Sequence, residues 1–212
     1  MKKLLISILS LLPFGAAAHK AEPAEPKALH DFLYKRAADL VQPYLVLHGI
    51  PEKKSKRERA KAQLEEAIGL FDRVLAINPQ NWAAAWLAGK AAQSLEQQER
   101  AYGYFARSFD VQKQNPDVAR ELMLTCLETR RAKEAVAVAE HAVRLTPSDA
   151  GLKANLALAR LCSADLVGAE EAIADALRSD PRDEISITLQ RLIGQVQRGE
   201  RKQPETPADL QR

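Results

Sequence analysis

The chain has 212 residues, 28% of them charged, and a formal net charge of +3 at pH 7. With few glycines and many alanines and leucines, it has the composition of a helical chain of one domain's size. Runs of alternating β-branched residues are absent, which argues against a sheet. The small net charge argues against nucleic-acid binding, because that requires many phosphates to be neutralised.

Residues 1–18 have the pattern of an export signal. Two lysines precede the apolar run 4–12, and the alanines at 16–18 form a small-residue cleavage site. The apolar run is too short to span a bilayer as a helix, although an uncleaved anchor is an alternative. We expect a mature chain that begins at His19, carries a formal charge of about +1 (3 minus 2 lysines), and is exported to a bacterial periplasm.

Residues 19–27 are rich in proline and alanine, and we expect a disordered linker there. Residues 28–48 have apolar side chains at helical spacing, with Pro43 expected to kink the helix. We expect this segment to be the first helix of a degenerate opening repeat, 28–79.

A basic segment follows. It contains Lys53, Lys54, Lys56, Arg57, Arg59 and Lys61. One interpretation is a solvated loop and the exposed first turn of the next helix. The other is an electrostatic contact with anionic lipid headgroups or an acidic partner, which added salt would weaken.

A repeat of 34 residues organises the rest of the chain. Ala67, Ala101, Ala135 and Ala169 are each 34 residues apart, and an apolar residue follows each alanine after four and after eight positions. The pattern predicts three full repeats, 82–115, 116–147 and 148–181, each formed by two short helices and a turn.

The repeat 148–181 shows how its helices begin and end. Asp149 and Asp165 each precede an amphipathic segment, where a carboxylate can accept the unpaired N–H groups of the first turn. Pro181 ends the second helix, since the residue before a proline is disfavoured in helical geometry.

This pattern resembles the tetratricopeptide repeat (TPR). In the unit that begins at Trp82, a small residue at position eight, alanine at twenty and an aromatic at twenty-four are Gly89, Ala101 and Phe105. The later units match through Ala119, Leu122, Ala135, Ala142 and Pro147, and through Leu156, Ala157, Ala169, Ala176 and Pro181. Departures are Trp86 at position five rather than four, Met123 at eight and Arg160 at eleven.

The resemblance implies an all-α chain, a right-handed α-solenoid of helix-turn-helix repeats. It also implies that the first helix of each repeat lines a concave groove. We expect the partner-binding residues of this groove to be Trp86, Lys90, Arg120, Glu121, Leu124, Asn155 and Leu158. Other groove positions are Ala83, Leu87, Gln93, Asp117, Leu127, Gly151, Ala154 and Leu161.

The groove lacks the clamp by which some family members hold the terminal carboxylate of chaperones. That clamp needs lysines, asparagines and an arginine at fixed positions. Here Trp86 replaces one lysine, and Glu121 and Gly151 occupy two further positions.

After the repeats, residues 184–198 carry apolar side chains on one face, and we expect a helix that caps the array. The polar, proline-containing residues 199–212 are expected to form a disordered tail. The two cysteines, Cys126 and Cys162, lie two repeat positions out of register, which makes a disulfide doubtful and predicts two free thiols.

The sequence contains no phosphate-binding glycine loop, nucleophile elbow or paired metal-ligand spacing, so we expect no catalytic activity, metal or cofactor. His30, His48 and His141 have no ligand spacing. We expect an adaptor, scaffold or assembly factor that binds a peptide or helix of another protein. The alternatives are a self-associating structural protein, with its groove filled by a second copy or its own N-terminal segment, and a small-molecule carrier.

Overall fold

The computed structural model describes residues 21–45 and 54–211. The predicted export signal, residues 1–18, and Lys53 of the basic segment lie outside the described residues.

The described residues form a succession of α-helices and no strands. The helices are α1 (Pro26–Leu45), α2 (Lys54–Ile77), α3 (Trp82–Ser94), α4 (Gln98–Val111), α5 (Pro116–Glu128), α6 (Ala132–Leu145), α7 (Ala150–Cys162), α8 (Leu166–Ser179) and α9 (Glu184–Gln197), followed by a short 3-10 helix, η1 (Pro207–Gln211). The predicted all-α solenoid is confirmed. None of these helices is long and apolar enough to cross a membrane.

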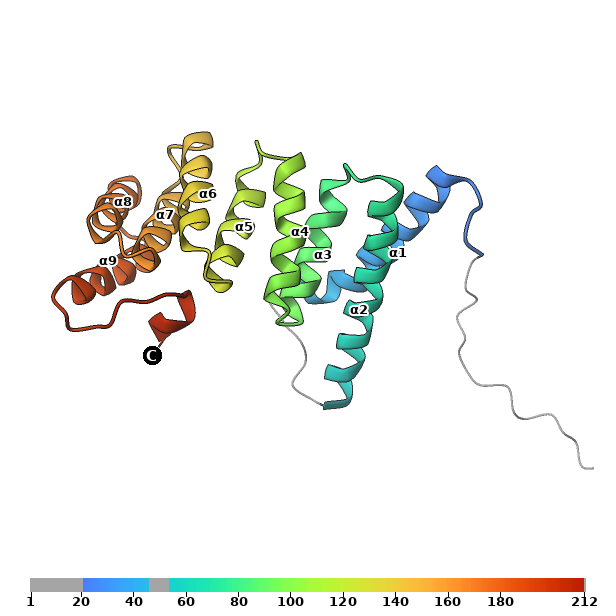
Figure 1. The fold of residues 1–212 in the computed structure, drawn as a ribbon, viewed down its shortest axis with the longest axis horizontal. Helices are drawn as coiled ribbons and strands as arrows, with labels where there is room; N and C mark the ends of the chain where they lie inside the picture. The colour runs from blue at the N-terminus through green and yellow to red at the C-terminus, as the bar shows by residue number, and fades with distance from the viewer. Residues whose placement is uncertain (1–20, 46–53, 212) are drawn as a thin grey trace, which may run out of the picture.

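The helices pack as a linear array in which each contacts its neighbours in the chain (Figure 1). The pairs are α1–α2, α3–α4, α5–α6 and α7–α8, and α9 packs on the last pair. We call α1, α3, α5, α7 and α9 the first helices, and α2, α4, α6 and α8 the second helices. First helices of successive repeats also touch: α5 contacts α7, and α7 contacts α9.

Small side chains allow the two helices of a pair to approach closely. Gly89 on α3 lies against Phe105 on α4, and a methyl group at Gly89 would lie 2.7 Å from Cε1 of that ring. Ala101, at the repeated alanine position, is fully buried. The Phe105 ring therefore occupies the space that a side chain at position 89 would need.

Helix starts follow the sequence. The Asp149 side chain accepts from the Leu152 N–H at 3.0 Å, and the Asp165 side chain accepts from the Gly168 N–H at 3.0 Å. Both predicted N-caps are confirmed. Asn81 and Asn115 cap α3 and α5 in the same way.

In three repeats, the turn between the two helices contains a residue with a strained backbone conformation. Glu96, Arg130 and Ala164 have positive φ values of 61°, 60° and 64°, in the left-handed region that favours glycine. Around Ala164, the Asp165 N–H donates to the Arg160 carbonyl at 3.0 Å and the Ala164 N–H to Leu161 at 3.0 Å. These two bonds form a Schellman motif, which satisfies carbonyls at the helix end.

Polar bridges join successive repeats along the second helices and the turns that precede them. Arg100 on α4 pairs with Glu65 on α2 at 2.9 Å, and Arg131 pairs with Glu99 at 2.9 Å. The Tyr102 hydroxyl donates to Glu134 at 2.9 Å. Partners in these bridges are 32 to 35 residues apart, so they follow the repeat.

Candidate functional site: the groove along the first helices

The predicted groove residues lie on three successive first helices. Trp86 and Lys90 are on α3, Arg120, Glu121 and Leu124 are on α5, and Asn155 and Leu158 are on α7. All seven are partly buried. The predicted groove has a polar part at α3 and α5 and an apolar part toward α7 and α9.

In the polar part, Lys90 is held by several partners. Its Nζ lies 3.2 Å from Oε2 of Glu121 and 2.9 Å from Oε1 of Gln93. The same Nζ lies 5.9 Å from the centre of the Trp86 ring, within reach of a cation–π attraction. Lys90 and Glu121 therefore neutralise each other and join α3 to α5.

Arg120 is held more loosely. Its Nη1 lies 2.9 Å from Asp117 and its Nη2 3.7 Å from Asp149, the N-cap of α7. The Arg120 side chain is 36% exposed, so it is the groove cation that solvent, or a ligand, can reach more easily than Lys90 at 21%.

The apolar part of the groove continues toward the end of the array. Leu161 and Leu127 are completely buried, whereas Leu124 and Leu158 are partly buried. Leu158 borders an open hollow of about 410 Å³ with residues of α9 and with Leu210 of η1. The α9 residues that line it are Glu184, Ile185, Thr188, Leu189 and Leu192.

The tail contradicts its predicted disorder. Residues 199–211 turn back and run from the end of α9 toward α5 (Figure 1), against which η1 packs. Pro204 is buried and Leu210 packs against the core. The Gln203 side-chain amide donates to the Leu161 carbonyl, and Glu205 pairs with Arg130. Two apolar residues and two polar contacts hold this otherwise polar segment.

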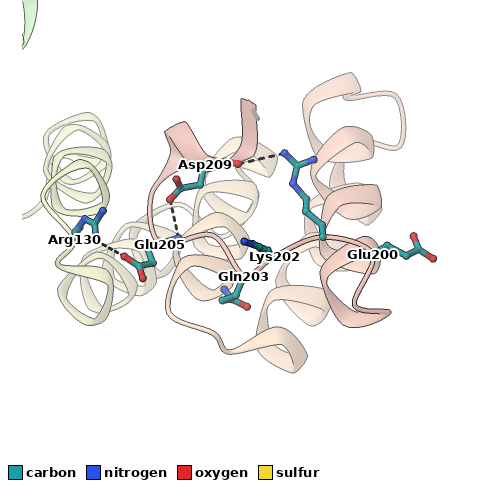
Figure 2. A pocket seen from close by; sticks show the side chains of 7 residues that line it. Arg130, Glu200, Lys202, Gln203, Glu205 and Asp209 are labelled. Carbon is teal, nitrogen blue, oxygen red and sulfur yellow. Dashed lines mark hydrogen bonds and ion pairs between the residues drawn. The ribbon is translucent and has the colours of Figure 1, made fainter.

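Beside the tail lies a charged hollow of about 770 Å³ (Figure 2). Its lining side chains are Arg130, Glu200, Arg201, Lys202, Gln203, Glu205 and Asp209. The tail also closes on itself here, because Arg201 donates to the Leu210 carbonyl at 2.6 Å and Asp209 accepts from the Thr206 N–H at 3.0 Å.

The predicted linker is also partly structured. Residues 21–27 are described, and α1 begins at Pro26. Glu22 accepts from Arg73 of α2 at 2.8 and 2.5 Å. This bidentate contact fixes the segment before α1, which composition alone did not indicate.

The described residues of the basic segment lie on the first turns of α2, where the sequence predicted an exposed first turn. Lys54, Lys56, Arg57, Arg59 and Lys61 all fall within that helix. Arg57 and Arg59 are exposed, and Lys61 is partly buried.

Cys126 and Cys162 are both free and buried. Burial raises the pKa of each thiol to about 12, with added contributions from Glu134 near Cys126 and from Asp209 and Glu128 near Cys162. Among the described residues, no group of three or more His, Cys, Asp or Glu side chains is placed to hold a metal ion. His141 Nε2 lies 2.7 Å from the Lys113 carbonyl, and its ring packs edge-on against Phe109.

Comparisons with known proteins identify the fold. No protein-family model and no curated protein matches the sequence. Among solved structures, MamA is similar with a TM-score of 0.62 and 16% identity, over 80% of this chain and 86% of that one. A second is YrrB, described as a TPR protein with an unusual peptide-binding site, with a TM-score of 0.59 and 16% identity over 86% and 88% of the chains.

A third similar structure is the first TPR of Spaghetti (RPAP3), bound to the HSP90 peptide SRMEEVD. Its TM-score is 0.52 and its identity 17%, over 56% of this chain and 94% of that one. Together with the array of helix pairs and the close contact of Gly89 with Phe105, these likenesses show that the chain has the tetratricopeptide-repeat fold.

Proposed function

We propose that the chain is a protein-interaction module of the bacterial cell envelope, which binds a peptide or helix of another protein along α3, α5 and α7. The observation that carries the proposal is the surface of these three helices. A Trp–Lys–Glu cluster, the accessible Arg120 and the partly buried leucines 124 and 158 follow one another on one groove.

The chemistry of this surface fits a peptide or helix. Leucine and tryptophan side chains supply apolar contact area, and charged groups at the edge set its orientation. Two proteins of the same fold, YrrB and RPAP3, bind peptides according to their descriptions. The envelope location is supported by the pattern of residues 1–18.

Contact of the basic segment with a membrane surface or an acidic partner stays a prediction. Arg57 and Arg59 are exposed on α2, on a different helix from the groove residues. Binding that persists when both are changed to glutamine would exclude this segment as the main contact.

The proposal is tested by photocrosslinking in intact cells. A photoreactive residue is placed at Trp86 or at Leu158, and a matched control at Ala137, an exposed position on the second helix α6. We expect one heterologous protein to be captured from both groove positions and not from Ala137. Crosslinks only between copies of this chain would favour the self-associating alternative.

A further inference from the structure

We propose that the C-terminal part of the groove is a peptide-binding site that the chain's own tail occupies, and that a partner segment of the same chemistry displaces the tail. The partner segment carries a glutamate that faces Arg130 and, five positions later, a leucine or larger apolar residue. This inference rests on the proposed use of the groove, and it names the kind of segment bound there.

The tail reverses its direction after α9 and runs back over the array. Gly199, at φ 71°, reverses the chain directly after α9. The N–H groups of Glu200 and Arg201 both donate to the Gln195 carbonyl, at 2.9 and 3.3 Å. The reversal directs residues 203–210 back over the C-terminal ends of α7 and α5, which belong to the predicted groove.

Two polar groups of the array contact side chains of the tail. Arg130, in the turn after α5, pairs with Glu205 of the tail (Figure 2), and the Leu161 carbonyl accepts from the Gln203 amide. The Arg130 guanidinium and the Leu161 carbonyl belong to the array and not to the tail. A guanidinium and a main-chain carbonyl can serve an external peptide in the same way.

An apolar hollow between α7 and α9 receives a leucine of the tail. Leu210 shares its hollow with Leu158 of α7 and with Leu189 and Leu192 of α9. About 410 Å³ of open space is left there, and Ile185 is 75% exposed. The tail therefore fills this hollow incompletely, and a segment with a bulkier apolar side chain would bury more of it.

The ion pair of the tail is weak enough for a partner segment to replace it. The side chains of Arg130 and Glu205 are 70% and 65% exposed, and ion pairs in such positions contribute little. The weak ion pair is offset by the covalent attachment of the tail, which gives the tail an effective concentration on the order of millimolar at the site. A partner must exceed that concentration or bind more tightly.

The test uses the full mature chain and a fluorescent synthetic peptide with the sequence of residues 200–212. Binding is measured by fluorescence anisotropy. Glu205→Lys and Leu210→Ser loosen the tail at positions outside the helical array. We expect Leu210→Ser to bind the peptide at least tenfold more tightly than the wild type, in which the tail blocks the site. Glu205→Lys removes only an exposed ion pair, so we expect a smaller gain of about two- to fivefold.

A charge exchange identifies the site. Adding Arg130→Glu to the Leu210→Ser chain should lower the affinity about two- to fivefold, because the ion pair is exposed, and a peptide whose Glu205 equivalent is lysine should recover it. The matched control, Arg144→Glu on α6, should leave the affinity unchanged. Circular dichroism and melting curves check that each variant is folded.

Equal peptide binding by the wild type and both tail variants would overturn the inference, and so would binding that ignores Arg130→Glu. The measurement needs only purified chain and peptide, whereas the groove proposal is tested by crosslinking in cells. Capture of a partner at Trp86 and Leu158, with no peptide binding here, would reject the tail inference alone.

Discussion

Lys90 on α3 and Glu121 on α5 are partners across the boundary between two repeats. Their Nζ and Oε2 atoms lie 3.2 Å apart, and the two side chains are only 21% and 18% exposed. Because Lys90 also lies over Trp86, one ammonium group connects an aromatic ring, an amide and a carboxylate. A ligand in this part of the groove would meet a nearly neutral surface.

Reversing one charge of this pair should destabilise the array. Lys90→Glu places two carboxylates close together, and we expect a loss of about 1 kcal/mol in the free energy of unfolding, with the chain still folded. The double variant Lys90→Glu/Glu121→Lys should recover most of the loss. Urea unfolding of the wild type, both single variants and the double variant measures the coupling. Additive effects would show that the pair does not interact.

Gly89 should tolerate no side chain. Gly89→Ala forces a methyl group against Phe105, and we expect a loss of roughly 1 to 3 kcal/mol through overpacking. Gly103, on the exposed face of α4, has no atom within 4 Å of an added Cβ. Gly103→Ala should therefore stabilise the chain by about 0.5 to 1 kcal/mol, through helix propensity. Thermal unfolding compares the two, and equal effects would contradict the close contact.

Replacing Ala164 by glycine should stabilise the fold. Its φ of 64° is costly for an L-residue with a Cβ and free of strain for glycine. We expect Ala164→Gly to raise the free energy of unfolding by up to about 1 kcal/mol, measured by urea denaturation. The control is Ala174→Gly, inside α8 at a helical position, which should destabilise by about 1 kcal/mol.

Alkaline pH should weaken the fold. Burial raises the pKa of Cys126 and Cys162 from 9.0 to about 12, so the folded chain keeps these thiols neutral. Their contribution is complete below pH 9, where both states are protonated. It is lost between pH 9 and about 12, because the unfolded state releases its protons first.

The pKa of Tyr104 is also raised, so this residue also makes the fold less stable at alkaline pH. Burial, together with its hydrogen bond to Asp72, raises its pKa from 10.0 to about 12. Urea midpoints at pH 8 and pH 11, in the presence of reductant, measure the effect. The decrease in the urea midpoint from pH 8 to pH 11 should be smaller in a Cys126→Ala/Cys162→Ala variant. An identical decrease in that variant would show that the thiols do not cause it.

The sequence predicted the array because its signal is repeated. The alanines 34 residues apart, the N-cap aspartates and the small residue at position eight are local features, and each determines a local contact. The partner of Lys90 could not be predicted, because it depends on which side-chain conformers meet across two helices. Gly199 followed by Pro204 and Leu210 was the available signal for a docked tail, but docking depends on a surface that forms only after folding.

The contacts of the tail differ in kind from those of the array. Several bridges between helices join residues about one repeat apart, as Lys90 and Glu121 are 31 apart, whereas Arg130 and Glu205 are 75 apart. Proteins dominated by contacts close in sequence fold quickly, and distant contacts add a larger loop-closure cost. The helical array should therefore assemble first, from its nearest neighbours, and the tail should dock last. Before residues 199–211 dock, the C-terminal part of the groove would be open in a nascent chain.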